Sequence, residues 1–246
     1  MAYPKEPERQ PFLRIPAATT GLIVVLVAAY VAAAFVSPTL SSAIIANYAF
    51  FPARYSHAFL VAHSMDPGTA WDRAVPFVSY IFIHANLAHL AVNCAFLLPF
   101  GSVVERRFGV LVYYVFFLVC GIGGAVGHLV THWGSPEYAI GASAAISGLV
   151  AAAFRIVAPL EAGEVQTFSD AVNGEARMQR PLAPLASPRL ATWSLMFIAI
   201  NVVLGRQFGF GPDAQLVAWQ AHIGGFLTGL VLADIFDRAA RMLRAR

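Results

Sequence analysis

The stretch FGVLVYYVFFLVCGIGGAVGHLV, residues 108–130, decides the fold class of this 246-residue chain, because it contains no Asp, Glu, Lys or Arg. A helix that crosses the hydrocarbon core of a bilayer needs about 20 mainly apolar residues. Lipid offers no partners to the backbone, so a spanning segment is a helix or a strand of a closed barrel. Barrel strands alternate apolar and polar residues, and the run LVYYVFFLVC does not alternate. The stretch therefore predicts a transmembrane helix.

Five further apolar stretches lie at residues 20–36, 79–100, 142–157, 190–204 and 216–235. With the first, they predict an all-α membrane protein, a polytopic bundle of six transmembrane helices. The chain is 59% hydrophobic and 12% charged, whereas soluble globular proteins are about 45–50% apolar and about 25% charged. Its mean hydropathy is +0.67. These values exclude a soluble globular enzyme, a disordered chain and a disulfide scaffold.

The distribution of Lys and Arg predicts how the bundle is oriented. If the N-terminus is inside, the outside segments contain three of the 16 basic residues, namely Arg54, Arg73 and Arg206, and the inside segments contain the other 13. Cytoplasmic loops carry an excess of Lys and Arg, so both termini are expected to be cytoplasmic. The basic excess is then a topology signal, and nucleic acid is not expected as a partner.

This topology divides the chain into a cytoplasmic N-terminal tail at 1–19, a membrane domain at 20–237 and a basic cytoplasmic tail at 238–246. Within the domain, residues 37–78 form an external loop, which we expect to lie at the outer membrane interface because long structureless loops are uncommon. Residues 158–189 form a flexible cytoplasmic loop. We expect a multi-pass protein of a bacterial cytoplasmic membrane, with its first helix retained as an anchor.

Polar side chains are costly at membrane depth, so each one within a predicted span is a candidate functional group. The topology places four of them in the outer half of three parallel helices: His89, Asn93, Ser143 and His222. At about 1.5 Å per residue, His222 lies about 9 Å into its helix. His89 and Asn93 lie about 15–20 Å into theirs, or less if that helix begins after residue 79.

A serine beside a histidine can act as a nucleophile with its general base. Ser143 is predicted in the first turn of its helix, where backbone N–H groups favour an oxyanion. No Asp or Glu reaches this depth, so the sequence predicts a Ser–His dyad without a third member. Each residue also has an ordinary structural interpretation: the serine can bond its own helix, and the histidines and the asparagine can join helices.

Four motifs stand in order along the chain: HANLAHLAVN at 84–93, GSVVERRFG at 101–109, GASAAISG at 141–148 and AHIGGFLTG at 221–229. In these motifs the sequence resembles the rhomboid intramembrane serine proteases. The resemblance implies a serine endopeptidase that hydrolyses peptide bonds in or near transmembrane segments of other membrane proteins. Its partners would be single-span membrane protein substrates and the lipid bilayer, and it would need no metal and no organic cofactor.

The resemblance also implies residue roles. Ser143 would be the nucleophile and His222 the base, while His89 and Asn93 would line the oxyanion hole with the Ser143 backbone N–H. Packing of the helices around the site would rest on three glycines: Gly141, Gly225 and Gly229. The stretch at 101–109 would belong to a connecting loop, and the fifth span would act as a lateral gate.

Two residues of the serine motif depart from the family pattern. Ala144 stands where glycine is commoner, and Ser147 stands where many relatives carry an aromatic ring that stacks on the catalytic histidine. The second departure leaves open a catalytically silent rhomboid-like protein that binds or escorts membrane clients. A haem or metal protein built on His128 and His132 is a third, weaker hypothesis.

Overall fold

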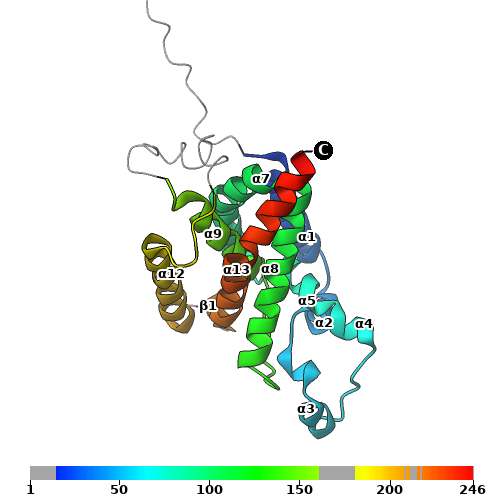
Figure 1. Cartoon of the computed structure of the whole chain (residues 1–246). Coiled ribbons are helices and arrows are strands. Elements are labelled where there is room, and N and C mark those ends of the chain that lie inside the picture. Colours follow the sequence, from blue (N-terminus) through cyan, green and yellow to red (C-terminus); the bar gives the residue numbers. More distant parts are fainter. Residues whose placement is uncertain (1–14, 161–180, 208, 211–214, 217, 246) are drawn as a thin grey trace, which may run out of the picture.

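The computed structural model describes residues 15–160, 181–207, 209–210, 215–216 and 218–245, and this part of the chain forms a helical bundle (Figure 1). Much of the predicted N-terminal tail and of the predicted loop at 158–189 lies outside the described residues. The long helices are α1 (Ala17–Ala34), α8 (Val110–Thr131), α9 (Ser143–Val157), α12 (Pro188–Gln207) and α13 (Trp219–Arg244).

Four helical stretches among the described residues are long and apolar enough to cross a membrane: Ala17–Ala34, Leu87–Phe108, Val110–Thr131 and Pro188–Gly205. Helix α9 is apolar but shorter. Helix α13 corresponds to the sixth predicted stretch, but Gln220, His222 and Asp234 interrupt its apolar sequence. Membrane crossing by α9 and α13 therefore stays a prediction.

The second predicted helix begins later than residue 79. Helix α5 (Pro76–Ser79) and the 3-10 turn η2 (Tyr80–Phe82) precede α6 (Leu87–Phe96). Asn86 starts α6, because its side-chain oxygen accepts a hydrogen bond from the backbone N–H of His89 at 2.9 Å, as an N-cap does. The predicted range was wrong at its start, since an apolar run does not reveal a cap.

The same helix also continues past residue 100. A π-helical turn, η3 (Leu97–Gly101), joins α6 to α7 (Ser102–Phe108). Pro99 lies within this turn, and because proline lacks an N–H it interrupts regular α-helical hydrogen bonding. The stretch GSVVERRFG is therefore mostly helical, and its assignment to a connecting loop was wrong.

The segment between α1 and α6 contains short helices rather than an unstructured loop. Besides α5 and η2 they are α2 (Pro38–Tyr48), η1 (Pro52–Tyr55), α3 (His57–Ala62) and α4 (Ala70–Ala74). At the start of α4, Thr69 and Asp72 form a capping box, and hydrogen bonds from the Thr69 hydroxyl and backbone N–H lower the pKa of the Asp72 carboxyl. An isolated bridge between Phe50 and Ala139 ties the segment to the residues that precede α9.

Helix α13 packs against α8 and α9 at the centre of the bundle (Figure 1). Glycines allow the close approach to α9: a side chain on Gly225 would collide with the Ala144 carbonyl, and one on Gly229 with the backbone of Gly148. The sequence placed both glycines at helix contacts, and that is where they lie. Because buried interiors are close-packed, this contact fixes the position of α13 along the axis of α9.

Charged side chains are buried at the end of the bundle that contains α7. The Glu105 carboxylate accepts hydrogen bonds from the backbone N–H groups of Ala18 (2.9 Å) and Thr19 (2.6 Å), which satisfies donors in the first turn of α1. Arg107 pairs with Asp237 of α13 at 2.6 Å, and both side chains are buried. Helix α7 therefore joins α1 to α13.

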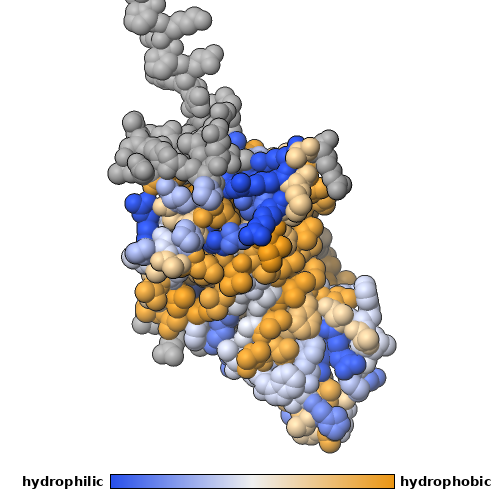
Figure 2. Space-filling model, in the orientation of Figure 1, coloured by the Kyte–Doolittle hydropathy of each residue, from blue (hydrophilic) through white to orange (hydrophobic). Residues whose placement is uncertain are grey.

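Figure 2 shows apolar residues gathered in a belt across the middle of the molecule, with hydrophilic residues at the α7 end. Leu111, Leu195 and Ile235, from three different helices, each expose more than 60% of their surface. Such extensive apolar exposure is unusual for a soluble monomer and fits a lipid-facing surface. A small departure from an all-α fold is the antiparallel pair β1 (Gly209–Phe210) and β2 (Gln215–Leu216).

Candidate active site

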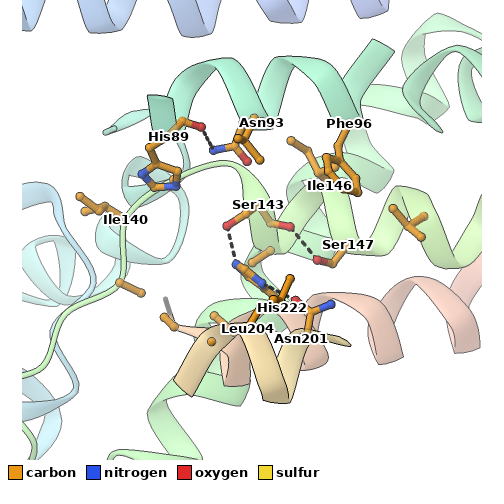
Figure 3. Close-up of a pocket in the computed structure, with 18 of the residues that line it drawn as sticks. His89, Asn93, Phe96, Ile140, Ser143, Ile146, Ser147, Asn201, Leu204 and His222 are labelled. Atoms are coloured by element: carbon orange, nitrogen blue, oxygen red, sulfur yellow. Dashed lines mark hydrogen bonds between the residues drawn. The ribbon is translucent and has the colours of Figure 1, made fainter. Parts of the chain in front are cut away.

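A cavity of about 600 Å³ lies between α6, α9, α12 and α13. Figure 3 shows its polar side chains pointing toward one another from these separate helices. Apolar side chains make up much of the remaining wall, among them Phe96, Ile146, Val150, Phe197, Ile200 and Leu204. The cavity therefore combines an apolar wall with a few convergent polar groups, as ligand and active sites commonly do.

Ser143 and His222 meet inside this cavity. Ser143 is the first residue of α9, and His222 lies in the first turn of α13. The Ser143 Oγ lies 2.7 Å from the His222 Nε2 (Figure 3), a normal length for a hydrogen bond. The two side chains that the sequence analysis paired are 79 positions apart and are in direct contact.

The α13–α9 contact places this pair. Ala144 follows Ser143 directly, and Gly225 lies three residues after His222, so the close approach of Gly225 to the Ala144 carbonyl holds both side chains at one level. The N-terminal ends of α9 and α13 therefore lie next to each other. Because Ser143 is the first residue of α9 and Ala142 provides no side-chain cap, the first backbone N–H groups of this helix can donate to a developing negative charge.

His89 and Asn93 lie on one face of α6 and line the same cavity. Asn93 Nδ2 donates one hydrogen bond to the His89 carbonyl at 3.0 Å, which leaves its second amide hydrogen for another acceptor. Since α6 begins at Leu87, His89 lies about 3 Å and Asn93 about 9 Å along the helix at about 1.5 Å per residue. These values are below about 15–20 Å because α6 begins later than residue 79, the case for which the sequence predicted a smaller depth.

Gly141 packs against α6 from the segment that leads into α9, and not from within a helix. It lies in the irregular segment before α9 with φ of +107°, a conformation that glycine adopts readily. A Cβ at this position would lie 2.6 Å from His89 Nε2 and 3.7 Å from Asn93 Nδ2. The absent side chain therefore lets the backbone before Ser143 lie directly against His89.

Ser147 lies one turn below Ser143, and its hydroxyl donates to the Ser143 carbonyl at 2.7 Å (Figure 3). This hydrogen bond within the helix is the ordinary use of a serine at that spacing. The contact to His222 that an aromatic residue would make is thus not replaced by Ser147.

A different residue, Asn201 of α12, contacts His222. Its Oδ1 lies 2.7 Å from the His222 Nδ1 (Figure 3). The sequence predicted a dyad because no Asp or Glu lies at this depth, and Asn201 was not predicted as a third member. The available signal was a polar residue within the fifth apolar stretch, but its depth did not reveal which way the side chain points.

His128 and His132 lie away from this cavity. Their rings stack at 4.5 Å, and the His128 Nε2 lies 3.1 Å from the Glu137 carbonyl oxygen. In the part of the chain that the structure describes, no three His, Cys, Asp or Glu side chains are grouped to hold a metal.

Comparison with known proteins places these residues in a family context. Residues 69–238 match the Rhomboid domain family. RHOMBOID-like protein 6, mitochondrial, from Arabidopsis thaliana is 27% identical over 161 residues, which are 64% of this chain and 42% of that protein. Rhomboid-like protein 11, chloroplastic, from the same plant is 29% identical over 192 residues, or 77% of this chain and 60% of that protein.

Rhomboid protease GluP of Bacillus subtilis (strain 168) is 27% identical over 166 residues, which are 68% of this chain and 26% of that protein. The chain thus spans between 26% and 60% of the length of these three relatives. The family match itself covers more than half of the chain and includes all four motifs. The chain belongs to the rhomboid family.

Proposed function

We propose that this protein is an intramembrane serine endopeptidase that cleaves transmembrane segments of other membrane proteins with a Ser143–His222 dyad. The observation that carries the proposal is the hydrogen bond of 2.7 Å between the Ser143 Oγ and the His222 Nε2. Its place in a cavity lined by apolar side chains adds support. Membership of a family that includes a protein named rhomboid protease agrees with it.

The chemistry follows from the positions of these groups. The Ser143 Oγ attacks the scissile carbonyl carbon while its proton passes to the His222 Nε2. The tetrahedral oxyanion accepts hydrogen bonds from the Ser143 backbone N–H, His89 and Asn93. The C–N bond then breaks, and His222 gives the proton to the leaving amine. Water, deprotonated by His222, attacks the acyl-enzyme ester and releases the new carboxyl terminus and the Ser143 hydroxyl.

The substrate would be an extended segment of a single-span membrane protein. A helix uses its carbonyl groups in internal hydrogen bonds, so a substrate helix must unwind locally before Ser143 can attack one of them. The cavity of about 600 Å³ has room for a few side chains of such a segment. Helix-weakening residues near the cleaved bond are therefore expected in good substrates.

The membrane arrangement proposed with this function is six spans, with both termini in the cytoplasm and the Ser143 end of the cavity near the outer surface. Residues 20–237 would be the membrane domain of a multi-pass protein in a bacterial cytoplasmic membrane. The apolar belt in Figure 2 supports a lipid-facing middle. The basic residues Arg238, Arg241 and Arg244 in the last turns of α13 support a cytoplasmic position for its C-terminal end.

The test is cleavage of a generic single-span substrate by the detergent-solubilised protein, with the cut identified by mass spectrometry. Wild type is expected to cleave, and Ser143→Ala is expected to be inactive. Ser42→Ala is the matched control, because Ser42 lies on exposed α2 and its hydroxyl donates only to the Pro38 carbonyl of its own helix. Cleavage that persists in Ser143→Ala would overturn the assignment, and an inert wild-type Ser143 would favour the silent, client-binding alternative.

A further inference from the structure

His222 has hydrogen-bond contacts at both of its ring nitrogens, each from a different helix. On one side, the Nε2 meets the Ser143 Oγ of α9 at 2.7 Å. On the other, the Nδ1 meets the Asn201 Oδ1 of α12 at 2.7 Å. A neutral imidazole carries one proton, so one nitrogen donates and the other accepts. Both hydrogen bonds can therefore form only in a tautomer that donates to one partner and accepts from the other.

Asn201 decides which tautomer that is. Its Nδ2 donates to the backbone carbonyl of Phe197 at 2.9 Å, which turns its carbonyl oxygen toward His222. A carboxamide oxygen can only accept, so the Nδ1 must carry the proton. The Nε2 then has a free lone pair facing the Ser143 hydroxyl, which is the arrangement that a general base requires.

We propose that Asn201 is a positioning residue that holds His222 in the Nδ1-protonated tautomer, so that α9, α13 and α12 together form a Ser–His–Asn arrangement. The inference rests on the proposed function and adds a third residue to the predicted dyad. Asparagine in this role is chemically sufficient, since a Cys–His–Asn set operates on an unrelated fold. The hydroxyl of Ser147 does not replace it, because it is bonded to the Ser143 carbonyl.

The position of Asn201 makes the catalytic histidine dependent on α12. Every residue of α12 from 191 to 204 keeps at least partial exposure, and the buried residues of the helix lie near its two ends, at Leu190 and Gly205. Arg189 fixes one end by donating to the Ala158 and Leu160 carbonyls at 2.8 and 2.7 Å. Hydrogen bonds weaken beyond about 3.2 Å, so a retreat of α12 by about 1 Å at Asn201 would release the Nδ1.

Asn201→Leu removes the acceptor with little change in volume. The expected fall in kcat lies between about tenfold, the equivalent of one neutral hydrogen bond, and about 10⁴-fold, the loss seen when an orienting group imposes the wrong tautomer. KM is expected to change by less than about twofold, because a leucine of similar volume keeps the cavity wall that Asn201 lines.

The experiment measures the tautomer directly, by ¹⁵N NMR of protein labelled in histidine, with the His222 signal identified by its loss in His222→Gln. Wild type is expected to show a protonated Nδ1, and Asn201→Leu is expected to show a shift toward a protonated Nε2. Asn201→Asp keeps an oxygen acceptor, so its Nδ1 stays protonated and its kcat exceeds that of Asn201→Leu. Thr192→Val is the matched control, since it removes a side-chain bond to the α12 backbone at an exposed site and is expected to change neither readout.

Each outcome decides one question. A wild-type tautomer with protonated Nε2, or a signal and kcat unchanged in Asn201→Leu, would overturn the role of Asn201. If Asn201→Leu does not fold, loss of the Nδ1 proton in Asn201→Asp would overturn it instead. A protein that cleaves nothing but shows the expected tautomer shift would refute the protease function and leave the positioning role standing.

Discussion

Gly225→Ala is expected to damage the site although it touches neither Ser143 nor His222. A Cβ built on Gly225 would lie 2.7 Å from the Ala144 carbonyl carbon, whereas ordinary van der Waals contact begins at 3.4 Å. The added atom would also press on the Ala144 carbonyl oxygen. Both are backbone atoms, which cannot rotate away. Helices α13 and α9 must therefore separate here by at least about 0.7 Å, the difference between these two distances, because the oxygen contact is the shorter of the two.

This separation lies next to the reacting groups. The Ser143–His222 bond is 2.7 Å long, and adding about 0.7 Å takes it past the usual limit of about 3.2 Å. Misplacement of about 1 Å can cost about 10²-fold in rate, so we expect kcat/KM to fall between about tenfold and about 10²-fold. Overpacking of a well-packed contact costs about 1–3 kcal/mol, so a lower unfolding temperature is expected as well.

The assay compares kcat/KM, the rate of fluorophosphonate labelling and thermal unfolding in detergent. Val231→Ile is the matched control, because it adds one carbon to α13 at a side chain that is 56% exposed. The control is expected to match wild type in all three. If Gly225→Ala also stays within about twofold of wild type, a range too small for a displaced hydrogen bond, then the α13–α9 contact does not position the dyad.

Three other predictions test separate parts of the account. Asn93→Ala is expected to lower kcat by about 10²–10³-fold, the usual effect of losing one oxyanion donor; an unchanged kcat would remove Asn93 from the mechanism. The cleavage rate is expected to fall on acidification, because a protonated His222 cannot accept the Ser143 proton, and a flat profile from mildly acidic to alkaline pH would contradict this role. Asp237→Ala leaves Arg107 buried without its carboxylate at 2.6 Å. This is expected to lower the free energy of unfolding by about 3–5 kcal/mol. A change below about 1 kcal/mol, typical of an exposed pair, would show that the Arg107–Asp237 pair is not stabilising.

The apolar helices and the family were predictable because both depend on local sequence. Apolar runs require helices in lipid, and four of the six predicted stretches coincide with helices long and apolar enough to cross a membrane. The family assignment from four short motifs is confirmed by the match over residues 69–238. Depth along parallel helices was enough to pair Ser143 with His222, because both lie in the first turn of their helices.

The start of α6, the Gly141 contact and the Asn201–His222 contact could not be predicted from apolar runs or motifs. They depend on a single side chain, on local backbone conformation or on the rotation of a helix. The apolar residues 79–83 run into α6 without a change of hydropathy, so only the Asn86 cap reveals where the helix starts. Gly141 matched a family motif, but its contact with His89 depends on a backbone conformation outside any helix. Asn201 reaches His222 because α12 is rotated to face α13, and the weak periodicity of a nearly all-apolar helix does not fix that rotation.

The central claim is that the Ser143 hydroxyl is activated by the His222 imidazole. The most direct measurement is the covalent labelling of purified protein by a fluorophosphonate probe, with the modified residue located by mass spectrometry. The account predicts one adduct, on Ser143, in wild type and its loss in His222→Ala. An unlabelled Ser143 in wild type, or equal labelling without His222, would contradict it.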